Sequence, residues 1–111
     1  MSGTSLDGLD IALCKIEGSG KNVKVELLEF CTMSYPDHFQ HSMRNLISSK
    51  DISLQELTLM NVHIGVVQAH LVNQALTNWG ISNEKVDAIA SHGQTIYHAP
   101  KIFHQEIEMG N

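Results

Sequence analysis

Basic side chains are few in this 111-residue sequence, and they do not cluster. Seven Lys and Arg stand against twelve Asp and Glu, which gives a formal net charge of −5. Nucleic acids and anionic membranes are bound mainly through clustered Lys and Arg, so neither is expected as the main partner. A phosphorylated ligand remains compatible with this composition if backbone N–H groups and a metal ion supply the positive charge.

Cysteines and long apolar runs are also scarce. Cys14 and Cys31 are the only cysteines; each lies in an apolar stretch typical of a strand, and neither belongs to a C-x-x-C pair. We expect two buried free thiols in a reducing compartment, in preference to a structural disulfide. No apolar run reaches the roughly 20 residues of a membrane span, and the polar, Gly-rich start is unlike a signal peptide. These absences predict a soluble, cytoplasmic protein.

Apolar residues make up 42% of the chain, an ordinary share for a globular protein, so a packed core is expected. The length is that of one domain, or of half a larger two-lobed protein. Residues 9–17 and 23–33 both alternate between apolar and polar side chains, and turn residues separate them. This pattern predicts a β-hairpin.

Two helices are predicted after the hairpin. Residues 37–49 place apolar side chains on one side of a short helix. A longer helix is predicted to begin at the capping box formed by Ser53 and Glu56 and to end at Gly80. Its length leaves open whether it packs only on the sheet or also forms the interface of a homodimer.

The pattern after the helices predicts a short, fully buried strand at residues 86–90 and a second short strand at 96–98. The order of hairpin, helices and strand is typical of an α/β domain with a mixed sheet. No strand feeds the loop that begins at Met1, and the chain stops at Asn111, where the pattern predicts that a strand ends in a turn. We therefore expect both ends to be cut from a longer fold.

The opening stretch "MSGTSLDGLD" is rich in glycine, hydroxyl and carboxylate groups. It lacks the Lys of a Walker A loop, the second glycine of a nucleophile elbow, and the spacing of a dinucleotide fingerprint. Glycine lets a backbone approach a ligand closely, and successive N–H groups form anion-binding nests. Beside a phosphate, Asp7 makes sense mainly through Mg²⁺, held directly or through water. The alternative is a hairpin turn with side-chain-to-backbone hydrogen bonds and no ligand.

A second candidate loop, "SHGQT", follows the predicted strand at residues 86–90. His92 and Gln94 flank Gly93 there, and ligand sites in α/β folds favour the carboxyl ends of strands. Imidazole and amide groups suit a polyol or amide ligand. The alternative is that both side chains satisfy local backbone groups.

The histidines do not predict a metal site. The chain has seven His, of which His92, His98 and His104 lie towards the end. They lack the i, i+4 pairing or Cys partners of a zinc site. His63 and His70 share a helix face but are expected to be solvated or packed in the core.

Together the two loops resemble the N-terminal part of the anhydro-N-acetylmuramic acid kinase family. "MSGTSLDGLD" is similar to that family's Gly/Ser/Thr phosphate loop, and "ASHGQTIYH" to its H-G-Q-T loop, in the same order and with the same intervening hairpin and helices. The resemblance implies the first lobe of an actin-like ATPase fold, which is ribonuclease H-like, with a mixed β-sheet and packed helices. Residues 1–111 would be a partial N-terminal lobe, without the first strand and the C-terminal lobe.

The resemblance also implies an activity. Members of the family use ATP to phosphorylate 1,6-anhydro-N-acetylmuramic acid, open its anhydro ring with water, and form N-acetylmuramic acid 6-phosphate in peptidoglycan recycling. The implied partners are ATP, Mg²⁺, the sugar and the rest of the kinase chain. The catalytic general base of the family is an aspartate expected beyond Asn111, so this chain by itself is not expected to catalyse the reaction. The alternative is a non-catalytic phosphate- or sugar-binding module that retains the fold.

Site residues follow from the same resemblance. The segment implied for the ATP phosphates consists of Gly3, Thr4, Ser5, Leu6, Asp7, Gly8, Leu9 and Asp10. Asp7 would lie closest to Mg²⁺ and to the transferred phosphoryl group. The residues implied to lie near the sugar are His92, Gly93, Gln94 and Thr95.

Overall fold

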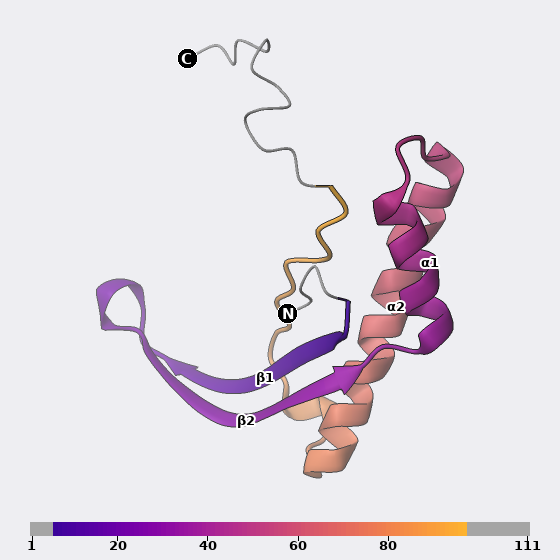
Figure 1. The fold of residues 1–111 in the computed structure, drawn as a ribbon. Helices are drawn as coiled ribbons and strands as arrows, with labels where there is room; N and C mark the ends of the chain where they lie inside the picture. Colours follow the sequence, from indigo (N-terminus) through magenta and orange to yellow (C-terminus); the bar gives the residue numbers. More distant parts are fainter. Residues whose placement is uncertain (1–5, 98–111) are drawn as a thin grey trace, which may run out of the picture.

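The computed structural model of the chain describes residues 6–97, which form one β-hairpin and two α-helices (Figure 1). Strand β1 (Gly8–Glu17) pairs antiparallel with strand β2 (Lys24–Ser34), and a short 3₁₀ turn, η1 (Gly20–Asn22), lies between them. The predicted hairpin is thus confirmed. Its register shifts between Leu13 and Cys14, where Leu28 of β2 has no partner and forms a bulge.

Helix α1 (Asp37–Ser48) follows Pro36, and helix α2 (Leu54–Trp79) follows Ser53. The Ser53 hydroxyl accepts a hydrogen bond from the Glu56 N–H at 3.4 Å, as the predicted capping box requires. Gly80 ends α2 in the left-handed conformation with φ at 68°, where glycine has no steric cost. Both predicted helices are confirmed. Neither is long and apolar enough to cross a bilayer, as far as residues 6–97 show.

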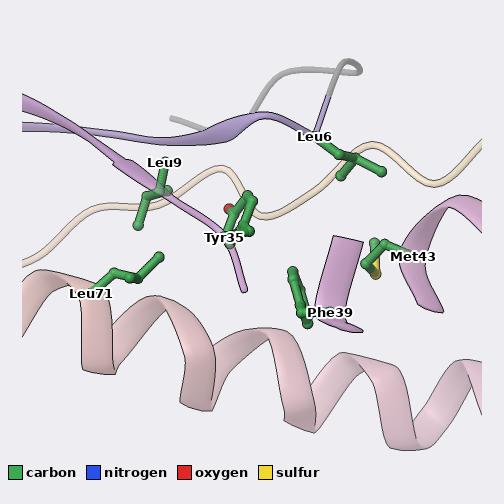
Figure 2. Packing of buried hydrophobic residues seen from close by; sticks show 6 residues of the cluster. All are labelled: Leu6, Leu9, Tyr35, Phe39, Met43 and Leu71. Atoms are coloured by element: carbon green, nitrogen blue, oxygen red, sulfur yellow. The ribbon is translucent and has the colours of Figure 1, made fainter. Parts of the chain in front are cut away.

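The core lies where the base of the hairpin meets the two helices (Figure 2). Helix α2 packs against both strands, while the far end of the hairpin extends away from the helices (Figure 1). Phe39 and Met43 of α1 are 0% and 1% exposed, and burying each contributes about 1.5–3 kcal/mol. The cluster of buried residues contains Leu6, Leu9, Tyr35, Phe39, Met43 and Leu71.

The two faces of the hairpin differ in composition. Strand alternation directs Leu9, Ile11 and Leu13 towards the helices. The opposite face, here called the outer hairpin face, is apolar and exposed. Its members are Ala12, Cys14, Ile16, Val25, Leu27 and Phe30.

The cysteine prediction is half right. Both thiols are free, as expected. The expectation that both are buried is wrong: Cys31 is half-buried, and Cys14 is exposed because strand alternation directs it to the outer hairpin face.

The strand predicted at residues 86–90 is wrong. After α2 comes a short 3₁₀ turn, η2 (Asn83–Lys85), and residues 86–97 form neither helix nor strand. Ile89 is 71% exposed rather than buried. A strand exists only by pairing, and the described sheet holds β1 and β2 alone. The strand predicted at 96–98 is absent at residues 96–97, and His98 lies outside the described residues.

Candidate functional site

The first candidate segment is described from Leu6 onward; Gly3, Thr4 and Ser5 lie outside the described residues. Leu6 has a φ of 58°, in the left-handed region that non-glycine residues rarely adopt. This conformation costs about 1 kcal/mol, and the burial of Leu6, which is 2% exposed, offsets that cost. The core therefore fixes the backbone direction immediately before Asp7.

The next three residues of this segment serve the hairpin. A Cβ on Gly8 would lie 2.7 Å from the carbonyl oxygen of Met33, so this position needs glycine because β2 approaches so closely. Leu9 is buried in the core. The Asp10 carboxylate accepts a hydrogen bond of 2.6 Å from the Thr32 hydroxyl across the two strands.

Asp7 differs from these neighbours because its side chain is 79% exposed. One carboxylate oxygen lies 3.8 Å from Nη2 of Arg44 on α1. An exposed ion pair of this kind contributes about 0–1 kcal/mol and does not commit the carboxylate to one partner. Within the described part of the segment, Asp7 thus presents an exposed carboxylate, a type of group that can hold Mg²⁺.

The second candidate loop is shaped by local hydrogen bonds. The Gly93 N–H donates to Ser91 Oγ at 3.1 Å, and Gly93 has a φ of 71°. Gln94 Nε2 donates to the Thr95 carbonyl at 3.2 Å. Gln94 is half-buried, whereas His92 and Thr95 are exposed. This contact of Gln94 is with a local backbone group, as the alternative interpretation expects, and His92 is exposed to solvent.

A chain of side-chain hydrogen bonds connects this loop to the core. Ser91 Oγ donates to Gln68 Oε1 at 3.4 Å, and Gln68 Nε2 donates to the Tyr35 hydroxyl at 3.1 Å. Tyr35 belongs to the same buried cluster as Leu6. Figures 1 and 2 both draw residues 86–97 running past the Leu6 end of β1. One core thus supports both candidate segments.

Sequence reasoning missed Gln68 and Tyr35. One sequence feature could have identified Gln68. This polar residue interrupts the apolar side of α2, four residues after Ile64 and three before Leu71. A polar side chain at such a position needs a hydrogen-bond partner. Its partners Tyr35 and Ser91 are 33 and 23 residues away in the sequence, and no spacing rule predicts hydrogen bonds at such separations.

His63 and the groove next to α2 do not add to this site. His63 packs edge-to-face on Phe39 with ring centroids 5.2 Å apart, which is a packing role. Residues 6–97 contain no group of three His, Cys, Asp or Glu arranged to hold a metal. A groove of about 370 Å³ lies between α2 and residues 83–89, and none of the candidate site residues line it.

Comparison with known proteins extends the resemblance to the entire chain. The family model described as "Anhydro-N-acetylmuramic acid kinase" matches residues 1–111. The anhydro-N-acetylmuramic acid kinase of Pseudoalteromonas atlantica is 49% identical over 111 residues, all of this chain and 28% of that protein. The protein of the same name from Pseudoalteromonas translucida is 43% identical over 111 residues, which again cover all of this chain and 28% of that protein.

A protein of the same name from Bacillus cereus is 43% identical over 101 residues, which cover 91% of this chain and 26% of the relative. The chain therefore spans between a quarter and a third of the length of these curated relatives. Their names agree on a kinase, and none of them supports the alternative of a binding module.

Proposed function

The chain belongs to the anhydro-N-acetylmuramic acid kinase family, and from this membership we propose that it acts within a longer kinase chain as part of its first lobe. The family is part of the sugar-kinase and actin-like ATPase superfamily, and the α/β architecture with packed helices agrees with it. The match of the family model to all 111 residues of the chain is the observation that supports the proposal most strongly.

The proposed reaction converts 1,6-anhydro-N-acetylmuramic acid and ATP to N-acetylmuramic acid 6-phosphate and ADP. Water adds to the anomeric carbon, the bond from that carbon to the bridging oxygen breaks, and the freed 6-oxygen accepts the terminal phosphoryl group. The general base that activates the water is an aspartate supplied by another part of the kinase chain. Because ATP is a cytoplasmic substrate, the proposal places the reaction in the cytoplasm.

The opening segment would bind the ATP phosphates. Gly3, Thr4 and Ser5 offer backbone N–H and hydroxyl donors, and Asp7 would hold Mg²⁺ directly or through water. Gly8, Leu9 and Asp10 would contribute by holding this segment at the start of the hairpin. When bound, the magnesium ion would neutralise charge that develops on the phosphate oxygens, the main electrostatic need of phosphoryl transfer.

The second loop would bind the sugar. His92 and Thr95 are the exposed side chains there, and imidazole and hydroxyl groups hydrogen-bond sugar hydroxyls. Gln94 and Gly93 would set the shape of the loop. If the full-length kinase forms a homodimer, the long helix α2 would supply its interface.

The experiment that tests this function measures ADP release by the full-length protein with Mg-ATP and 1,6-anhydro-N-acetylmuramic acid. We expect ADP release that depends on the sugar, with a phosphomonoester product detected by ³¹P NMR. N-acetylmuramic acid, which has no bridge to open, is the matched control substrate. Equal ADP release with and without the anhydro sugar would contradict the proposal.

A further inference from the structure

Gln68 is a polar residue placed on the inward side of a largely apolar helix. It is half-buried on α2, between Ile64 and Leu71 along the same side. Its amide is bonded at both ends, through Nε2 to the Tyr35 hydroxyl at 3.1 Å and through Oε1 to Ser91 Oγ at 3.4 Å. Because a side-chain amide offers donors and an acceptor at fixed angles, two such bonds fix its orientation.

One end of this chain of hydrogen bonds is rigid. Tyr35 is 2% exposed, and its ring centroid lies 5.0 Å from that of Phe39. Gln40 Nε2 also donates to the Tyr35 carbonyl at 3.1 Å. The hydroxyl that meets Gln68 is therefore held by a packed ring and a fixed backbone.

The other end reaches the candidate sugar loop. The Ser91 hydroxyl donates to Gln68 and accepts from the Gly93 N–H, so one oxygen joins helix α2 to the turn at Gly93. Residues 86–97 form neither helix nor strand. These residues lack the regular backbone hydrogen bonds of a helix or strand, so their conformation depends more on side-chain hydrogen bonds.

We propose that Gln68 is a positioning residue that holds the loop from Ser91 to Thr95 in the orientation that sugar binding needs, with Tyr35 as its anchor. Gln68 acts through Ser91 and does not touch the sugar. The proposal rests on the proposed function, because it takes this loop as the sugar-binding loop. ATP binding depends on the opening segment and does not need this bond.

The kinetic test uses the full-length protein and three changes that each remove one link: Gln68→Met, Tyr35→Phe and Ser91→Ala. We expect the sugar KM to rise about tenfold while the ATP KM stays within about twofold. Tenfold corresponds to about 1.4 kcal/mol, the size of one net hydrogen bond. Gln68→Glu keeps an acceptor for both hydroxyls and should restore much of the sugar affinity.

The matched control is Gln74→Met, which makes the same change at an exposed position of α2 and should leave both KM values unchanged. Amide hydrogen exchange over residues 86–97 provides a readout that does not need activity. We expect faster exchange there in Gln68→Met than in the unmodified protein or the control.

These readouts separate the two proposals. Faster exchange in Gln68→Met, in a protein that shows no sugar-dependent ADP release, would show that Gln68 holds the loop but would reject the kinase function and the link between this loop and sugar binding. Unchanged exchange and unchanged sugar KM would overturn the positioning role. Equal rises in both KM values, together with a lower thermal midpoint, would also overturn it, because they indicate a general loss of core stability.

Discussion

At the scale of single residues, Asp7 and Gly8 show how neighbours in one motif take separate roles. Gly8 is required because the Met33 carbonyl leaves no room for a Cβ, so its presence needs no ligand to explain it. Asp7 points to solvent, and its contact with Arg44 is a long surface ion pair. The ligand role proposed for the motif would therefore depend on Asp7 more than on the glycine beside it.

We expect Asp7→Asn in the full-length protein to lower kcat with Mg-ATP by roughly 10- to 100-fold, the usual effect of disturbing a group that orients a bound metal. Arg44→Met removes the ion pair but leaves the carboxylate, and should change kcat by less than about twofold. Steady-state kinetics at several Mg²⁺ concentrations measures both. If the two variants lost the same activity, Asp7 would act through Arg44 and not through the metal.

At the scale of elements, helix α2 begins at a capping serine, ends at a left-handed glycine, and has apolar residues on two sides. Its inner side packs on the hairpin through residues such as Leu71. Its other side exposes Leu59, Val62 and Val66, each more than 60% accessible. A helix that is apolar on two sides is suited to lie between two layers, so we expect a further element of the full-length kinase to cover the second side.

Ser53→Ala should weaken the start of α2, because the Glu56 N–H then loses its acceptor. The expected cost is about 1 kcal/mol, measured as a lower thermal midpoint of the full-length protein. Ser53→Asp keeps an acceptor at the cap and should leave the midpoint nearly unchanged. A midpoint that falls equally in both variants would show that the hydroxyl does not stabilise α2 by capping.

At the scale of the whole molecule, the outer hairpin face is an apolar surface that the described residues leave uncovered. Ile16, Val25, Leu27 and Phe30 are each between 57% and 65% exposed. Sheets in α/β proteins are covered by helices on their apolar faces, and the curated relatives are more than three times as long as this chain. We expect the rest of the kinase chain to cover this face.

The 111-residue chain produced alone should therefore bind the dye ANS and self-associate, because both this face and the sheet edge are open. Changing Leu27 and Phe30 together to Ser should reduce dye binding and light scattering of the isolated chain. The same double change should lower the thermal midpoint of the full-length protein, where we expect this face to be buried. A well-behaved monomer with a cooperative thermal transition would contradict this expectation.

The sequence by itself determined the parts of this protein that depend on local chemistry. The alternation of β1 and β2, the cap at Ser53 and the stop at Gly80 are all encoded within a few residues. The two loop motifs also identified the family.

Only the tertiary structure decided which surfaces meet. The apolar run at residues 86–90 has strand composition but no strand beside it in the described sheet, so it does not form one. Cys14 lies in an apolar strand yet is exposed, because its side chain points away from the helices that cover the other face. The bonds from Gln68 to Tyr35 and Ser91 join residues far apart in the chain. Strand pairing, side-chain burial and long-range hydrogen bonds each depend on a second segment as much as on the residue itself. That second segment comes into contact with the residue only when the chain folds.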